Sequence, residues 1–432
     1  MRIIRALCAW VAPLALAGCA VTSAVEQQVA AGPPANVATE AHPVDLTHGL
    51  GFFTARFYPA LARKADRNDN LFISPLSLSQ GIGLASLGAR GQTAAEIGHL
   101  QGWPDTSGPA MLTASYNARL LATGDPKVEM RIANALWLAD GMPVRQDYLA
   151  AAARAYQARP QTVPFERAPQ AAAERINGWV SERTRGRIPR IVSAEQLSGA
   201  TAAVLTNAVY FKGDWQVPFN DGAEGLFTTA DGTSKPIYLM ERVAPMQYRE
   251  TREGQAVALP YGESGRFVME IFLPRSAAIL QRWEQELHGL SFFAGAQGSD
   301  GRFDLSAEKP TDVLLRLPRF EARFNDELGK VLAAAGMSCA FREGCADFSG
   351  IAARPMKIDG VAHATFLRVD EQGTEAAAAT ALSIVVTGAR IVRPSVPRMI
   401  VDRPFLVTLR DRASGALLFF GRISDPKAVA TR

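Results

Sequence analysis

Residues 369–405, VDEQGTEAAAATALSIVVTGARIVRPSVPRMIVDRPF, combine two opposed conformational preferences in one segment. Four consecutive alanines at 376–379 favour a helix, because alanine has the highest intrinsic helix propensity. The apolar residues that follow, among them Ile384, Val385 and Val386, favour a strand. A stretch rich in proline and arginine then leads into the apolar run that begins at Met399. No stop signal separates the two preferences, so the role of this segment has to be inferred from the rest of the chain.

The chain has 432 residues and the composition of a soluble globular protein, with 48% hydrophobic and 20% charged residues. Its formal net charge of +4 is small for this length, and the sequence contains no long run of lysine or arginine. We therefore do not expect nucleic-acid binding. The five histidines and four cysteines are few and scattered, so no metal site and no cofactor is expected.

The N-terminus is typical of an export signal. Arg2 and Arg5 precede an apolar stretch that is too short to span a bilayer. The stretch ends in LAGC, residues 16–19, which resembles a bacterial lipobox, in which cleavage precedes a cysteine that is then lipidated. We interpret residues 1–18 as a lipoprotein signal peptide and Cys19 as the lipidated residue. The alternative is an ordinary signal peptide with a chance cysteine.

Residues 19–45 then form the lipidated cysteine and a flexible tether, because they are rich in alanine, valine and proline and lack periodicity. Ala20 after the cysteine resembles the outer-membrane sorting signal. The protein is therefore expected to be exported and anchored by lipid to the outer membrane, on its periplasmic or cell-surface face. Residues 46–428 contain no second linker and are expected to form one domain.

Two cysteines, Cys339 and Cys345, remain in that domain. Exported proteins reach compartments that permit disulfides, so a bridge across CAFREGC is favoured over two free thiols. The loop is short, and the chain-entropy model therefore gives such a bridge only about 2 kcal/mol of stabilisation.

Hydrophobic periodicity predicts several elements of the domain. Helices are expected at 47–65, within 71–91 and at 325–337, the last with Asn325 or Asp326 as its cap. Strands are expected at 200–215, 266–274 and 313–320, and a hairpin at 403–423. Helices predominate in the first half of the chain and strands in the second, which indicates an α+β fold without regular βαβ alternation.

The common catalytic signatures are absent, including G-x-S-x-G, H-E-x-x-H, the phosphate-binding loop and C-x-x-C, so the chain is not expected to be an enzyme. The glycines of GIGLASLGARG, residues 81–91, do not fit a nucleotide-binding pattern and are interpreted as helix packing. His363 lies in a strand-like run and is expected to be a hydrogen-bonded core histidine. Glu270 is expected on the solvent side of its strand.

A series of segments, taken in order along residues 46–428, resembles the serpin family of serine protease inhibitors. These segments are NLFISPLSLSQGIGLASLGARGQTAAEI, TNAVYFKGDWQVPF, LRLPRFEARFNDELGKVLAAAGM, ADFSGI, VAHATFLRVDEQGTEAAAAT and DRPFLVTLRDRASGALLFFGRI. Together with the N-terminal signal, they identify the chain as resembling a bacterial lipoprotein member of this family with an inhibitory-type hinge.

The resemblance implies a serpin fold, with three β-sheets, about nine helices and an exposed reactive-centre loop at about residues 371–398. In inhibitory serpins a protease cleaves this loop and forms an acyl-enzyme, and the cut loop inserts into the central sheet and traps the protease. The resemblance thus implies a suicide-substrate inhibitor of serine proteases, with cysteine proteases as a further target class. The alternative is a non-inhibitory serpin that serves as a binding or chaperone module, although such members usually carry bulky or charged hinge residues.

The hinge implied by the resemblance is EQGTEAAAAT. Its proposed functional residues are Glu371, Gly373, Thr374, Glu375, Ala376, Ala377, Ala378, Ala379 and Thr380. Alternate side chains of a strand share a face. The small residues at 374, 376, 378 and 380 would therefore turn toward the core on insertion, whereas composition alone would favour an exposed helix.

Counting from the hinge glycine as in the family places the scissile bond at Thr387–Gly388. The valines before it suit an elastase-like or subtilisin-like protease. The loop is longer than in many members, which leaves two alternatives open: a bond at Arg390–Ile391, which would suit a trypsin-like protease, and a bond after Val386.

Two clusters are implied to control insertion. A shutter beneath the central sheet would consist of Ser74, Ser77, Asn207 and His363. A breach, where the loop begins to insert, would consist of Trp215, Arg319 and Glu371. If the Arg319–Glu371 pair is exposed, it contributes only about 0–1 kcal/mol. The expected partners are a target protease and the membrane, and the protein is expected to be a monomer.

Overall fold

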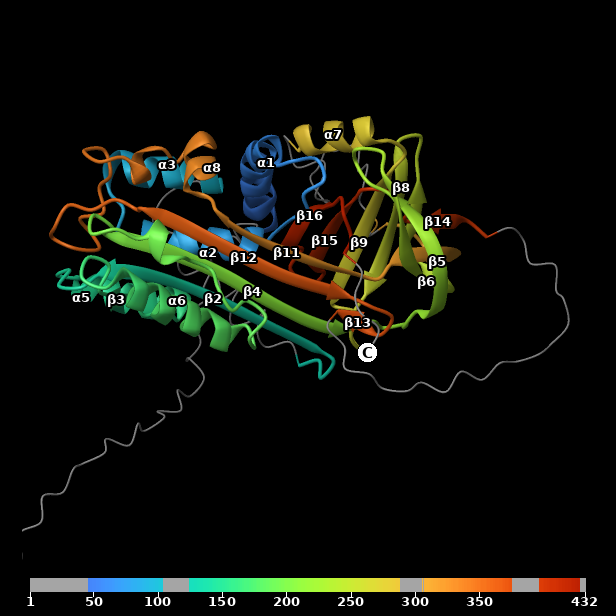
Figure 1. The fold of residues 1–432 in the computed structure, drawn as a ribbon, viewed down its shortest axis with the longest axis horizontal. Coiled ribbons are helices and arrows are strands. Elements are labelled where there is room, and N and C mark those ends of the chain that lie inside the picture. Colours follow the sequence, from blue (N-terminus) through green and yellow to red (C-terminus); the bar gives the residue numbers. More distant parts are fainter. Residues whose placement is uncertain (1–45, 104–123, 288–304, 306, 375–395, 428–432) are drawn as a thin grey trace, which may run out of the picture. The chain divides into compact units, whose positions relative to one another are not determined.

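Three β-sheets form the framework of the described residues, which are 46–103, 124–287, 305, 307–374 and 396–427 of this computed structural model (Figure 1). The central sheet has the order β11 (Phe320–Glu327), β12 (Gly360–Val369), β13 (Gly373–Thr374), β4 (Ala203–Asp214), β2 (Val128–Ala139) and β3 (Gln161–Val163). The second sheet has the order β1 (Leu71–Ile73), β16 (Leu417–Ile423), β15 (Phe405–Asp411), β9 (Phe267–Pro274), β8 (Gly254–Pro260) and β7 (Tyr248–Glu250). The third has β14 (Arg398–Ile400), β10 (Thr311–Pro318), β6 (Ser234–Met246) and β5 (Asn220–Thr228).

Seven α-helices and two short 3-10 helices occur in the described residues. The α-helices are α1 (Leu46–Lys64), α2 (Pro75–Ser86), α3 (Gly91–Gln101), α5 (Gln146–Tyr156), α6 (Pro169–Arg183), α7 (Ala277–Gln285) and α8 (Gly329–Ala334). The 3-10 helices are Ala194–Gln196 and Cys339–Phe341. The predicted mixed α+β fold with three sheets is confirmed, and the described part of the chain contains no helix long and apolar enough to cross a membrane.

Helix α2 begins at the Ser-Pro pair predicted to start it. The side chain of Ser74 accepts a hydrogen bond from the Ser77 amide at 3.2 Å, and Pro75 occupies the first turn, where its missing N–H is not needed. The glycines of this helix permit close packing: a Cβ on Gly81 would collide with the side chain of Asn207, and one on Gly83 with the hydroxyl of Tyr156. Their role in helix packing follows from these contacts.

The predicted cap of α8 is wrong. Asn325 and Asp326 belong to β11, where they lie opposite Ala364 and His363 of β12, and the helix begins only at Gly329. Pairing with β12 along the whole of β11 outweighs the capping preference of these two residues, because tertiary contacts override local propensity.

The predicted solvent exposure of Glu270 is also wrong. Its side chain is buried on β9, where Thr408 Oγ1 donates to its carboxylate at 2.7 Å and Arg410 Nε at 3.1 Å. Both partners come from β15, the neighbouring strand in the second sheet. A buried carboxylate is tolerated here because it is paired and hydrogen-bonded.

Helix α6 covers one face of the central sheet (Figure 1). Ile176 and Val180 of α6 belong to a hydrophobic cluster that also contains Trp137 of β2, Ala208 of β4 and Ala364 of β12. The helix packs against β2, and its hydrophobic cluster continues to β4 and β12. A rearrangement of β4 and β12 would therefore change a cluster to which α6 contributes.

Candidate functional site

The candidate site lies along the contact between β4 and β12, called the seam below. The two strands pair directly and in parallel from Val204 opposite Gly360 to Tyr210 opposite Phe366. Beyond this point, β13 lies between them and is antiparallel to both (Figure 1). The central sheet thus holds a short extra strand at one end of the seam.

A tight turn returns the chain from β12 into β13. The Asp370 amide donates to the Gly373 carbonyl at 2.9 Å, and the Gln372 amide donates to the Asp370 carboxylate at 3.1 Å. Burial of this carboxylate raises the pKa of Asp370. A Cβ on Gly373 would collide with the carbonyl oxygen of Gly213, so this point of the seam requires glycine.

Thr374 is the first hinge side chain within the sheet, and it is fully buried. Its hydroxyl lies 2.6 Å from the hydroxyl of Tyr261, and burial raises the pKa of Tyr261 well above its ordinary value. The ring of Tyr261 stacks on that of Trp215, with centroids 4.3 Å apart. A pair of stacked aromatic rings therefore lines the buried site of Thr374.

The proposed breach residues come together around the turn. The Trp215 indole Nε1 donates to the Asp370 carbonyl at 2.9 Å, and its backbone amide donates to the Gln372 carbonyl at 2.8 Å. The guanidinium of Arg319 pairs with the Glu371 carboxylate, with Nε 3.1 Å from Oε1. Their side chains are only 13% and 14% exposed, so this ion pair is not the solvent-exposed kind.

The proposed shutter residues also form one cluster. The Ser74 amide donates to His363 Nε2 at 3.0 Å, and the Ser74 hydroxyl donates to the Leu418 carbonyl at 2.7 Å. Asn207 Nδ2 donates to the carbonyl oxygen of Ser77 at 3.3 Å. Asn207 and His363 lie opposite one another on β4 and β12, so the cluster spans the seam.

Sequence reasoning missed two members of this cluster, Asn134 and Gln80. The Asn134 carboxamide accepts from the Ser77 hydroxyl at 2.6 Å and from Asn207 Nδ2 at 3.2 Å, and it donates to Gln80 Oε1 at 3.1 Å. The available signal was an asparagine within the otherwise apolar stretch IANALWLA, residues 132–139 of β2, because a buried polar side chain needs a hydrogen-bond partner.

Burial dominates the acid–base behaviour of His363. It lowers the pKa of the imidazole from 6.5 to about 3, so the ring is neutral at physiological pH. Among the described residues, His363 Nδ1 and Asn207 Oδ1 are buried polar atoms without a hydrogen-bond partner. The shutter cluster therefore keeps unused hydrogen-bonding capacity on both sides of the seam.

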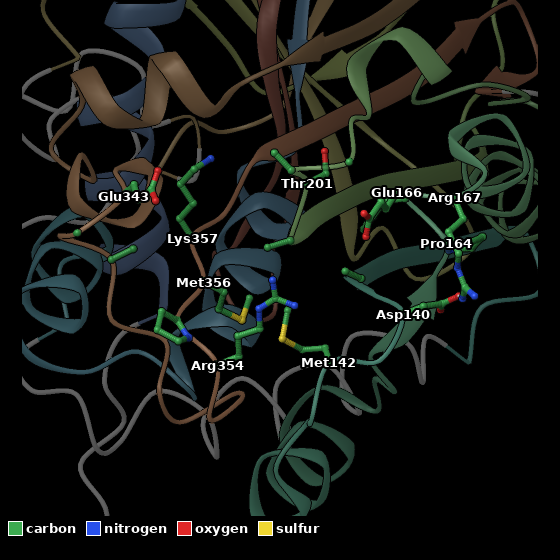
Figure 2. A pocket seen from close by; sticks show the side chains of 18 residues that line it. Asp140, Met142, Pro164, Glu166, Arg167, Thr201, Glu343, Arg354, Met356 and Lys357 are labelled. Carbon is green, nitrogen blue, oxygen red and sulfur yellow. The ribbon is translucent and has the colours of Figure 1, made fainter.

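A cavity of about 600 Å³ lies at the opposite end of the seam, where β4 and β12 begin (Figure 2). We call it the sheet-end cavity. Ala200, Thr201, Met356 and Lys357 line it from the segments that lead into the two strands, and Arg354 lies beside them. It thus lies at the end of the seam opposite to β13.

Several predicted residues lie outside the described residues. These are Cys19, the hinge positions Glu375, Ala376, Ala377, Ala378, Ala379 and Thr380, and the candidate reactive-bond residues Val386, Thr387, Gly388, Arg390 and Ile391. By contrast, Cys339 and Cys345 are described and are joined in a disulfide, with Cα atoms 5.1 Å apart.

Comparison with known proteins identifies the family. The family model described as serpin (serine protease inhibitor) matches residues 48–426. The chain is 34% identical over 398 residues to a serpin-like protein of Thermococcus kodakarensis, covering 91% of this chain and 88% of that protein. It is 32% identical over 379 residues to the leukocyte elastase inhibitor of Xenopus tropicalis, covering 85% and 96%. The native crystal structure of the thermophilic serpin tengpin matches with a TM-score of 0.78 at 23% identity, covering 90% of this chain and 96% of that one. The chain therefore belongs to the serpin family.

Proposed function

We propose that this serpin inhibits proteases by inserting its cleaved reactive-centre loop between β4 and β12. The observation that carries the proposal is β13. Gly373 and Thr374 of the hinge already lie between the two strands and pair with both. Further insertion would extend a strand that has begun, while the direct β4–β12 pairing opens residue by residue.

The register of β13 gives each hinge residue a place in the inserted strand. Thr374 lies opposite Gly213 of β4. Because the two strands are antiparallel, each later residue of the hinge would pair with an earlier residue of β4. The positions that share the buried face of Thr374 are Ala376, Ala378 and Thr380, and their partners on β4 would be Phe211, Val209 and Asn207. Small side chains at these positions would fit against the existing core, in which Phe211 and Val209 are buried.

The shutter cluster would complete its hydrogen bonds in the inserted state. In the same register, Thr380 would lie opposite both Asn207 and His363. A threonine hydroxyl donates one hydrogen bond and accepts others, so it could serve the unpartnered Asn207 Oδ1 and His363 Nδ1. This gain would favour insertion over the native arrangement.

We infer the end of the inserted strand by extending the same register. Thr387 would reach the level of Ala200 on the β4 side and Met356 on the β12 side. Both residues line the sheet-end cavity. A protease joined to Thr387 would therefore finish at this cavity, a full sheet length from the turn at Gly373.

The chemistry is that of the target protease. Its serine Oγ attacks the carbonyl carbon of Thr387, the Thr387–Gly388 peptide bond breaks, and the proton passes to the new amine of Gly388. An ester then joins Thr387 to the protease. Insertion competes with hydrolysis of this ester. It is favoured by the backbone hydrogen bonds that a new central strand forms with both of its neighbours. The alternatives after Val386 and Arg390 follow the same chemistry.

The proposed target is an elastase-like or subtilisin-like serine protease. Thr387 follows two valines, and one relative of this chain is described as a leukocyte elastase inhibitor. The LAGC motif supports a lipid anchor at Cys19, with outer-membrane sorting as its proposed destination. The protein would then act at a membrane surface.

The experiment is incubation of the purified chain with elastase, subtilisin and trypsin, followed by a denaturing gel. We expect a protease–serpin complex that survives SDS with at least one enzyme. The mass of the released C-terminal fragment fixes the bond, because it begins at Gly388, Ile391 or Thr387 for cleavage after Thr387, Arg390 or Val386. Loop cleavage that leaves every protease fully active would contradict inhibition and favour a non-inhibitory binding module.

A further inference from the structure

A second cavity, of about 680 Å³, lies at the edge of the central sheet between α2, α5, α6 and β2. We call it the arginine cavity. Three arginines line it: Arg159, which follows α5, and Arg175 and Arg183, both on α6. The described residues around the cavity include no aspartate or glutamate. Its lining therefore carries a net positive charge.

The arginines have few partners within the described residues. Arg159 and Arg175 form no ion pair or hydrogen bond there, and both are exposed. Arg183 is 3.8 Å from the carboxylate of its neighbour Glu182, and its guanidinium lies 4.2 Å above the ring of Trp179. Like charges that converge on one cavity repel one another, so an anion bound between them would relieve this repulsion.

The remaining lining groups suit an anion whose phosphate or sulfate group is attached to a larger molecule. Gln157, Gln161 and Asn134 supply carboxamides, while Trp179 and Pro160 supply apolar surface. The planar guanidinium binds phosphate and sulfate in a bidentate manner, and several guanidiniums can share one multivalent anion.

The floor of the arginine cavity is part of the shutter cluster. Gln80 and Asn134 line the cavity, and Asn134 also accepts hydrogen bonds from Ser77 and Asn207. Two of the three arginines lie on α6, whose hydrophobic cluster continues to β4 and β12 on both sides of the seam. A ligand in this cavity would thus contact both the shutter cluster and the helix whose hydrophobic cluster reaches the seam.

We propose that the arginine cavity binds a multivalent phosphate or sulfate anion, which links α6 to the segment after α5. The bound anion fastens α6 to the sheet in its native position, and it therefore slows the opening of the seam. The binding site stands on the cavity itself, whereas its effect on insertion rests on the proposed inhibitory function.

Binding is tested with the full chain and sodium tripolyphosphate, by calorimetric titration at constant ionic strength, so that general screening does not change. The change in tryptophan fluorescence that Trp179→Phe removes gives a second readout, because an anion that engages Arg183 draws this guanidinium away from the Trp179 ring. We expect Arg175→Gln and Arg183→Gln each to weaken binding about tenfold, and the triple variant with Arg159→Gln to abolish it. The matched control is Arg154→Gln, which removes an exposed arginine of α5 that does not line the cavity and should leave affinity unchanged.

A second titration identifies the source of the anion. Phosphatidylcholine vesicles with and without phosphatidic acid present the same phosphate on a lipid headgroup. The site is supported if the wild type binds tripolyphosphate or the anionic vesicles and the triple variant does not. The probe that binds identifies the source of the anion. The site is overturned if neither probe binds, or if the triple variant binds as well as the wild type.

The proposed effect of the anion on the seam is tested by the rate at which SDS-stable complexes with the protease form in the presence of a saturating concentration of the probe. We expect a lower rate in the wild type and no change in the triple variant. An unchanged rate in the wild type, despite measured binding, would overturn the effect on the seam and leave the binding site intact. If no complex forms with or without the probe, the inhibitory function itself fails, and the binding result is unaffected.

Discussion

The hydroxyls of Thr374 and Tyr261 lie 2.6 Å apart beneath the end of the seam where β13 separates β4 from β12. Tyr261 is held by stacking on Trp215, whose backbone and indole nitrogens both bond to the turn before β13. Thr374, the residue proposed to insert first, therefore occupies a fully buried site beside two aromatic rings. Such a site suits a small side chain and disfavours a charge.

Thr374→Arg should convert the inhibitor into a substrate. Burying an unpaired guanidinium at this position would cost several kcal/mol, so β13 could not form with its side chain in the sheet. Insertion would then be slower than hydrolysis of the acyl-enzyme. The measurement is the number of serpin molecules cleaved per protease molecule inactivated, with circular dichroism to check the fold. Thr374→Val is the matched control, because it keeps the shape and loses only the hydroxyl contact. Covalent complexes at the wild-type ratio in the arginine variant would show that Thr374 is not the first inserted residue.

Gly373→Ala should slow insertion as well. The added Cβ would collide with the Gly213 carbonyl and displace β13 from the sheet, so insertion would have to begin without this short strand in place. We expect a higher cleaved-to-trapped ratio in the same assay. Gly360→Ala on β12 is the control, since its Cβ would meet no atom nearer than 4.0 Å. Equal effects of the two substitutions would show that the loss of glycine's backbone freedom, and not a clash at the seam, slows insertion.

Glu371→Gln should weaken the native state by about 2 kcal/mol, because it leaves a largely buried Arg319 without its carboxylate. The measurement is the midpoint of urea unfolding of the uncleaved protein. Glu321→Gln, which breaks the ion pair with Arg323, an arginine that is 56% exposed, should cost less than about 1 kcal/mol. A similar cost for both substitutions would show that burial of the Arg319–Glu371 pair adds nothing to its strength.

The buried imidazole of His363 should make native stability depend on pH. Its pKa falls from 6.5 to about 3 on folding, so below pH 6.5 the unfolded chain binds a proton that the native state excludes. The free energy of unfolding should therefore decrease as the pH falls from about 6.5 toward 3, by roughly 1 kcal/mol between pH 7 and 5.5. The readout is the difference between wild type and His363→Gln in denaturant unfolding at several pH values, because other groups titrate in both. Parallel pH profiles would mean that His363 takes up its proton as readily in the native state.

Much of the fold was predictable from segments whose pattern agrees with their environment. The run at 200–215 is apolar because β4 is paired on both sides and covered on both faces, and the Ser-Pro start of α2 caps itself locally. The errors concern residues decided by distant partners. Glu270 is buried because Arg410 reaches it from a strand 140 residues away, and Asn325 is a strand residue because β12 pairs with it.

The candidate site shows the same division. The positions of Ser74, Asn207 and His363 followed from a family resemblance, whereas their link to Gln80 and Asn134 required the register between β2 and β4. The sequence indicated that the hinge residues are small, but only the pairing of Thr374 with Gly213 defines which of them would share a buried face. The arginine cavity was equally inaccessible, because its arginines come from two elements that are adjacent only in the folded chain.

The most direct test of insertion is the melting temperature of the loop-cleaved chain beside that of the intact chain, measured by circular dichroism at the same concentration. If the cut loop enters the seam as a new strand of the central sheet, the cleaved form should melt well above the intact form. The same melting temperature for both forms would show that the loop stays outside the sheet, and it would contradict the proposed trapping mechanism.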